Sequence, residues 1–117
     1  MQKNATILYY QKNSYYVIEL PTIGSLEYVL ECDDNDNNYS SSFAYIISVF
    51  IIPSQRRQGW GTFLVKKLVD TLKKQHVYKI KLDNVLVKRN KFYKKLGFVF
   101  TRSDDNEMCL IFNQQCA

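Results

Sequence analysis

A chain of 117 residues is long enough for one domain with a modest core, and 46% apolar residues, with nine tyrosines and seven phenylalanines, argue against disorder. No apolar run reaches the ~18 residues that a membrane-spanning helix needs, so we expect no membrane partner. The net charge of +5 is uneven: residues 1–53 hold two basic and six acidic side chains, whereas residues 54–117 hold fourteen and five. This asymmetry predicts a polyanionic ligand on the second half, either a nucleotide-like cofactor or a nucleic acid.

The cysteines and the first residues predict a reducing compartment. Cys32, Cys109 and Cys116 are odd in number and lack a C-x-x-C spacing, so we expect free thiols rather than disulfides or a metal site. The polar start at residues 1–4 lacks the apolar segment of a secretory signal. We therefore expect a cytoplasmic protein without a bound metal.

The first half of the chain reads as β-structure, because it is rich in β-branched and aromatic residues. Strands are predicted over residues 5–10, 15–20, 25–31 and 44–52. The last of these is apolar almost throughout, which is typical of a strand buried on both faces. Residues 11–14 and 21–24 provide turns. Residues 33–42 are largely polar and predict a solvated loop, since they lack the glycine and the final glutamate of a calcium-binding loop.

The second half alternates helices with strands. Residues 63–75 predict an amphipathic helix with three leucines on its apolar face, Leu64, Leu68 and Leu72. A short basic helix is predicted over residues 88–96, with Gly97 placed to end it. Further strands are predicted within residues 77–85 and over residues 98–100 and 108–112. We therefore predict a single domain over residues 1–117, with an α/β (α+β) fold.

Between the long strand and the helix lies a basic turn with two glycines, Arg56-x-x-Gly59-x-Gly61. A strand, a glycine turn and a helix together aim backbone N–H groups and a helix N-terminus at a phosphate. The turn is not a Walker A loop, because no Lys-Ser/Thr pair follows the second glycine, and Leu64 stands where a dinucleotide-binding turn has its third glycine. Taken alone, the two glycines also suit a tight connection without any ligand.

This turn and a second segment, residues 90–98 (NKFYKKLGF), resemble the two signature motifs of the GNAT family of N-acetyltransferases, in the same order. The resemblance covers about residues 24–112. It implies a mixed central sheet of about six strands with two main helices, and the N-terminal helices of that family are missing or reduced here. Within the family, residues 77–83 and 106–109 are most similar to the glucosamine-6-phosphate N-acetyltransferases.

The resemblance implies that acetyl-CoA binds at the end of the long strand and in the turn. The strand would hold the pantetheine arm through main-chain hydrogen bonds, and the turn would surround the pyrophosphate with backbone amides and arginines. The implied cofactor-binding residues are Phe50, Ile51, Ile52, Arg56, Arg57, Gln58, Gly59, Trp60, Gly61, Thr62, Asn90 and Lys95. Trp60 stands where the family usually has an aliphatic residue, and packing against the helix explains it equally well.

The implied catalytic residues are Tyr93 and Asp83. Tyr93 would donate a proton to the leaving sulfur, although it also suits a core position beside Phe92. Asp83 resembles an acid of the sugar-phosphate enzymes and would take the proton of the amine. A backbone N–H at Ile52 or a neighbour would polarise the thioester carbonyl.

One part of the family pattern is missing. The sugar-phosphate enzymes carry an acidic pair on the long strand, and the corresponding residues here are Ile47 and Ser48. His76, at the end of the long helix, is expected on the surface rather than in the site. The candidates for the general base therefore stay open between a bound water, Asp83, Glu31 and Tyr45.

The resulting prediction is an acetyl-CoA-dependent N-acetyltransferase in which a primary amine attacks the thioester directly, with a small amine such as an amino-sugar phosphate as the first acceptor. Two alternatives stay open. One is a protein or peptide N-acetyltransferase, favoured by an open acceptor side and the acidic residues 33–36, and the other is an acetyl-CoA-binding module that has lost catalysis. The short N-terminal part also suggests a second subunit, with a homodimer contact at residues 108–112. Nucleic acid is the weakest partner, because basic helical faces are usually solvated.

Overall fold

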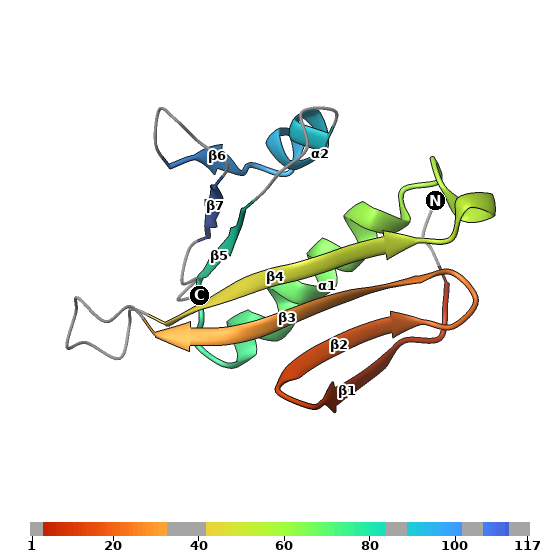
Figure 1. The fold of residues 1–117 in the computed structure, drawn as a ribbon, viewed down its shortest axis with the longest axis horizontal. Coiled ribbons are helices and arrows are strands. Elements are labelled where there is room, and N and C mark those ends of the chain that lie inside the picture. The colour runs from red at the N-terminus through yellow and green to blue at the C-terminus, as the bar shows by residue number, and fades with distance from the viewer. Residues whose placement is uncertain (1–3, 33–41, 84–88, 102–106, 113–117) are drawn as a thin grey trace.

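The computed structural model describes residues 4–32, 42–83, 89–101 and 107–112. All strands within these ranges join one mixed seven-stranded sheet in the order β1-β2-β3-β4-β5-β7-β6 (Figure 1). The expected α+β sheet with two main helices is confirmed, with seven strands rather than about six. The elements are β1 (Leu8–Lys12), β2 (Tyr15–Leu20), β3 (Gly24–Cys32), β4 (Ser42–Ile51), α1 (Trp60–Lys74), β5 (Lys79–Leu82), α2 (Asn90–Lys95), β6 (Val99–Phe100) and β7 (Met108–Ile111).

The first four strands form an antiparallel meander. β1 pairs with β2 as far as Lys12↔Tyr15, so only Asn13 and Ser14 remain for the turn. Asn13 has a φ of 57°, which suits the two-residue hairpin turns that match the twist of paired strands. The predicted loop over residues 11–14 is therefore too long, because the tight turn lets its first two residues enter the ladder.

β4 separates from β5 after a short parallel pairing. The two strands pair only at Ala44↔Ile80 and Tyr45↔Lys81, whereas β4 continues to pair with β3 as far as Ile51. Figure 1 shows β4 and β5 diverging beyond this point. Within the described residues, one edge of β4 beyond Tyr45 thus has no strand partner, and its backbone groups are open to a ligand.

An extra residue interrupts the regular pairing of β4. Glu27 pairs with Ser48 and Tyr28 with Ile46, so Ile47 has no opposite residue on β3. A bulge of this kind increases the local twist and re-aims the neighbouring side chains. Ile47 is 49% exposed, so the prediction that this strand is buried on both faces is wrong at its centre.

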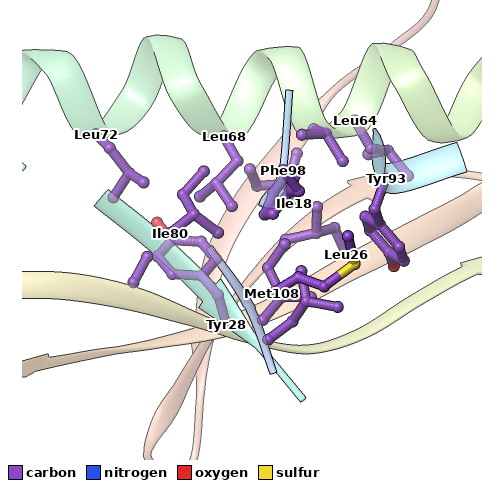
Figure 2. Close-up of a cluster of buried hydrophobic side chains, with 14 of the residues drawn as sticks. Ile18, Leu26, Tyr28, Leu64, Leu68, Leu72, Ile80, Tyr93, Phe98 and Met108 are labelled. Carbon is purple, nitrogen blue, oxygen red and sulfur yellow. The ribbon is translucent and has the colours of Figure 1, made fainter. Parts of the chain in front are cut away.

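The core lies between α1 and one face of the sheet. Leu64, Leu68 and Leu72 are fully buried at four-residue spacing, and Figure 2 shows them on the side of α1 that faces the strands. The same cluster contains apolar side chains from four strands, Ile18, Leu26, Tyr28, Ile80 and Met108. Each fully buried leucine contributes about 1.5–3 kcal/mol, so the predicted apolar face of this helix holds the fold together. Neither described helix combines the length and the apolar character that a membrane span needs.

Both helices end in the same hydrogen-bonded motif. At α2, Phe98 N–H donates to the Tyr93 carbonyl and Gly97 N–H donates to the Lys94 carbonyl, both at a distance of 3.0 Å, and Gly97 has a φ of 103°. This is a Schellman motif, whose left-handed position favours a residue without Cβ. The prediction that Gly97 ends this helix is confirmed. α1 ends in the same way, with the exposed His76 at the left-handed position (φ 61°).

β7 is an interior strand of the sheet. It lies between β5 and β6, so β1 and β6 are the sheet edges in the described part of the chain. β6 pairs with β7 only at Phe100↔Met108 and Val99↔Cys109. The homodimer contact expected at residues 108–112 stays a prediction, and it would have to use a face of β7 or the part of its edge beyond β6.

Candidate active site

The turn after β4 brings backbone N–H groups together at the start of α1. One turn of 3-10 helix (Pro53–Gln55) follows β4, and Arg57 (φ 65°) and Gly59 (φ 84°) then adopt left-handed conformations. Gly59 is the N-cap, and its carbonyl accepts a hydrogen bond from Phe63 N–H at 3.0 Å. The helix thus begins at Trp60, three residues before the predicted start. The first turn of the helix carries no acidic side chain, so its positive end faces no carboxylate from its own turn.

A pocket of about 570 Å³ opens between this turn, the end of β4 and α2. Its volume lies within the range of small-molecule sites, about 300–1,000 Å³. The lining residues are Val49, Phe50, Ile51, Gln55, Arg56, Arg57, Gly59, Trp60, Gly61, Thr62, Arg89, Phe92 and Tyr93. They include most of the predicted cofactor-binding residues and the predicted acid. The predicted cofactor-binding residues outside the lining are Ile52, Gln58, Asn90 and Lys95, and the predicted catalytic residue Asp83 is also outside it.

Four lining residues are not among the predicted site residues, although Phe92 belongs to the second signature motif: Val49, Gln55, Arg89 and Phe92. Arg89 precedes Tyr93 by four residues at the start of α2, and this spacing places both side chains on one side of a helix. This four-residue spacing is the sequence signal that could have identified Arg89 as a pocket residue. Asn90, although outside the lining, has a buried side-chain oxygen without a hydrogen-bond partner in the described part of the chain.

The two sequence motifs touch each other inside this pocket. A Cβ placed on Gly61 would lie 3.1 Å from Cζ and 3.3 Å from Cε1 of Phe92. Carbon atoms ordinarily pack at about 3.5–4.0 Å, so glycine is what allows the start of α1 to approach α2 this closely. The second glycine of the turn therefore serves the packing of the pocket wall as well as the backbone path.

Three arginines give the pocket a positive charge, and none of the described residues that line it is acidic. Arg56 donates its Nε–H to the Ile51 carbonyl at 2.7 Å, and its guanidinium lies 5.6 Å from the ring centre of Phe50. These contacts hold the side chain against the end of β4 and leave its terminal nitrogens for another acceptor. With Arg57 and Arg89, the site can make charge-assisted hydrogen bonds to a phosphate.

The backbone of β4 presents alternate residues to its open edge. Ile52 N–H donates to the Ile23 carbonyl at 2.8 Å, on the side of β3. This corrects the expectation that the Ile52 amide polarises a thioester, because that amide is already bonded. Since neighbouring residues of a strand direct their backbone groups to opposite edges, the groups of Ile51 and Val49 face the open edge. The Ile51 carbonyl that accepts from Arg56 agrees with this orientation.

Tyr93 belongs both to the core and to the pocket. It is 5% exposed, its ring packs edge-on against Phe92 (4.8 Å between ring centres) and Phe98 (5.5 Å), and it lines the pocket. Burial raises the pKa of Tyr93, and the charge of Arg89 opposes this effect. The hydroxyl is therefore protonated at neutral pH, which is the state that a proton donor requires.

Asp83 lies away from the pocket, where β4 and β5 begin to diverge. It is exposed and accepts a short hydrogen bond from the hydroxyl of Tyr45 on β4. This hydrogen bond, with smaller contributions from burial and nearby carboxylates, raises the pKa of Tyr45 to about 12. Tyr45 thus keeps its proton at neutral pH and does not suit the role of general base. It orients the Asp83 carboxylate instead.

The described residues include no group of three or more histidine, cysteine, aspartate and glutamate side chains that could hold a metal ion. Two cysteines fall within the described ranges, and both are free thiols. Cys32 is exposed, whereas Cys109 is buried. Burial raises the pKa of the Cys109 thiol, which keeps it in the unreactive protonated form.

A family model described as the acetyltransferase (GNAT) family matches residues 5–98. No curated protein matches the sequence. Many solved structures share the fold. Among them, a crystal structure of AtaTR bound with acetyl-CoA is 18% identical, with a TM-score of 0.65, and the match covers 83% of this chain and 69% of the other.

Two further structures extend the comparison. AtaT complexed with acetyl-methionyl-tRNAfMet is 17% identical, with a TM-score of 0.65 over 83% of this chain and 69% of its own. An acetyltransferase of the GNAT family from Staphylococcus aureus Mu50 is 16% identical, with a TM-score of 0.66 over 86% of this chain and 70% of its own. At these identities the likeness concerns the fold alone. A particular similarity to glucosamine-6-phosphate N-acetyltransferases is not found among these proteins.

Proposed function

The chain belongs to the acetyltransferase (GNAT) family and is an N-acetyltransferase, and on that premise we propose that it transfers the acetyl group of acetyl-CoA to a primary amine. The observation that carries this proposal is the pocket in which Gly61 of the turn meets Phe92 of α2. It combines a helix N-terminus, three arginines and an open strand edge, which are the groups that a phosphate-bearing, amide-containing cofactor needs.

The parts of the pocket suit different parts of acetyl-CoA. The amides at the start of α1, with Arg56, Arg57 and Arg89, would bind the pyrophosphate. The open backbone groups of Val49 would pair with an amide of the pantetheine arm, since the Ile51 carbonyl already accepts a hydrogen bond from Arg56. Asn90 and Lys95 stay proposed contacts near the start and end of α2.

The proposed reaction is a direct transfer. The neutral nitrogen of the acceptor attacks the thioester carbonyl carbon, the new C–N bond forms, and the C–S bond breaks with its electron pair on sulfur. Tyr93 gives its proton to that sulfur, and a bound water takes the amine proton. Asp83 lies outside the pocket beside Tyr45 and would receive that proton only through a chain of waters. The N–H of Ile51 replaces that of Ile52 as the proposed donor to the carbonyl oxygen.

The acceptor has three candidates. A small amine such as an amino-sugar phosphate rests on the similarity of residues 77–83 and 106–109 alone. A lysine of a basic polypeptide is favoured by the acidic side chains that the sheet exposes, Glu19 and Glu27 among them. An amine carried by RNA is suggested by the AtaT complex with acetyl-methionyl-tRNAfMet, although a nucleic-acid partner stays the weakest of our expectations.

Calorimetric titration with acetyl-CoA tests the cofactor pocket. We expect binding by the wild type, a loss of affinity of about tenfold or more in Arg57→Gln, and no change in Lys73→Gln, which removes the same charge at the far end of α1. Absence of acetyl-CoA binding by the folded wild type would overturn the proposal. Mass spectrometry of an amine panel then separates the enzyme from the alternative of a decayed module, which would bind acetyl-CoA and acetylate nothing.

A further inference from the structure

The sheet has one face that α1 does not cover, and we call it the open face. The core side chains Leu26, Ile46 and Ile80 point to α1, so the residues that alternate with them point to the opposite side. Strand register places Glu27 beside Ser48 and Tyr45 beside Lys81 on that side. In Figure 1, β3 and β4 pass in front of α1, β2 and β1 continue the sheet beside them, and no described helix crosses these strands from the viewer's side.

The open face gathers most of the acidic side chains that the structure describes. The hydroxyl of Tyr10 donates to Glu19 at 2.8 Å, and this hydrogen bond and the charges of Glu19 and Glu27 raise the pKa of Tyr10. Further along the sheet, Tyr45 senses three more carboxylates. The acidic residues of this face are Glu19, Glu27, Glu31, Asp83 and Glu107. Asp70 on α1 is the only other acidic residue in the described part of the chain, and it does not lie on the open face.

The two sides of β4 therefore carry opposite charges. Among the described residues, the pocket at its end is lined by three arginines and no acid, whereas the open face carries five carboxylates and three lysines, Lys12, Lys79 and Lys81. The whole chain, by contrast, has a net charge of +5. An anionic cofactor is thus attracted to one side of the strand and a cationic molecule to the other, which keeps the two ligands from competing for one surface.

The spacing of the acids favours an extended molecule over a small one. Glu27 and Glu31 are four residues apart on β3, which is about 13 Å at the ~3.3 Å rise of a strand, and Glu19 lies on the next strand. A small amine meets one or two of these carboxylates, whereas a polypeptide with several basic side chains can meet all of them. Exposed apolar side chains on the same face, Leu8 (43%) and Tyr10 (42%), can pack against the aliphatic stems of lysines.

We propose that the open face binds a basic polypeptide segment and presents one of its lysine amines to the gap between β4 and β5. This inference rests on the proposed function, because the gap is where the open edge of β4 leads from the cofactor pocket. Glu19 and Glu27 act as specificity residues that attract flanking basic side chains, and like charge on the same face disfavours phosphorylated acceptors.

Steady-state acetylation of matched peptides tests the proposal. One peptide carries a central lysine between basic residues, and the other carries the same lysine between glutamates. Glucosamine 6-phosphate and methionyl-tRNA complete the panel. We expect the basic peptide to have the highest kcat/KM, and the double variant Glu19→Gln/Glu27→Gln to raise its KM roughly fivefold to tenfold at low salt with kcat preserved. Asp70→Asn, which removes the same kind of charge from exposed α1, should leave the KM unchanged.

Three results would overturn the proposal: equal use of the two peptides, preference for the sugar phosphate or the tRNA, or an unchanged KM in the double variant. If light scattering shows a dimer for the wild type and a monomer for the double variant, the open face binds a second copy of the chain and the proposal is wrong. Fluorescence anisotropy of the labelled basic peptide, without acetyl-CoA, measures the surface separately. Calorimetry with acetyl-CoA should give the same affinity for all variants, so a failure of the cofactor site is distinguishable from a failure of the open face.

Discussion

The contact between Gly61 and Phe92 can be tested by a double-mutant cycle. Gly61→Ala adds a Cβ at 3.1 Å from Phe92 Cζ, and the ring cannot retreat freely because it packs against Tyr93 at 4.8 Å between ring centres. Overpacking of this kind costs about 1–3 kcal/mol. Alanine also stabilises a helix relative to glycine by up to about 1 kcal/mol. We therefore expect Gly61→Ala to lower the free energy of unfolding by roughly 0–2 kcal/mol.

Phe92→Leu removes both ring atoms that the new Cβ would meet. In the Phe92→Leu background, Gly61→Ala still stabilises the helix but no longer clashes with a ring. The two substitutions should therefore be coupled by roughly 1–3 kcal/mol. Urea unfolding of the four proteins measures this coupling. The matched control is Phe100→Leu on β6, which should combine additively with Gly61→Ala because no Phe100 atom is among the near contacts of that Cβ.

Additivity of Gly61→Ala and Phe92→Leu within about 0.5 kcal/mol would refute the close approach of the two motifs. Acetyl-CoA affinity provides a second measurement on the same proteins. It should fall in Gly61→Ala alone, because a displaced Phe92 moves the pocket wall, and it should recover at least in part in the double variant.

Single residues give three further predictions. Gly97→Ala should destabilise the protein by about 1–2 kcal/mol, because it places a Cβ at a φ of 103°. His76→Gly, at the equivalent position of α1, should stabilise the protein by up to about 1 kcal/mol. Changes of the same sign in the free energy of unfolding of both variants, measured with urea, would contradict this reasoning. Arg56→Lys should weaken acetyl-CoA binding about tenfold in calorimetry although the charge is kept, because lysine lacks the Nε–H that is donated to a β4 carbonyl; full affinity would rule out that role. Asp83→Asn should return the pKa of Tyr45 from about 12 toward its ordinary value of about 10, read by NMR of the tyrosine ring carbon. In the wild type, this hydrogen bond stabilises the fold fully below pH ~10 and less as the pH rises through about 12, and an unchanged pKa in the variant would exclude Asp83 as its cause.

Local chemistry alone determined several features of the site. The leucine spacing of α1 predicts its buried face, and the basic glycine turn predicts a positive site after an apolar strand, because periodicity and left-handed backbone positions are properties of short segments. Gly97 ends α2 for the same reason. These features appear in the structure close to where the sequence places them.

Only tertiary structure decided the features that depend on pairing between distant segments. The Ile52 amide points to β3 and not into the site, because strand register sets which edge each backbone group faces. The bulge at Ile47 and the departure of β5 from β4 are likewise defined by the pairing of separate strands and have no short sequence signature. The acids of β2 and β3 are far in the sequence from Asp83, which follows β5, and the shared face on which we propose that an acceptor binds exists only once these strands are in register.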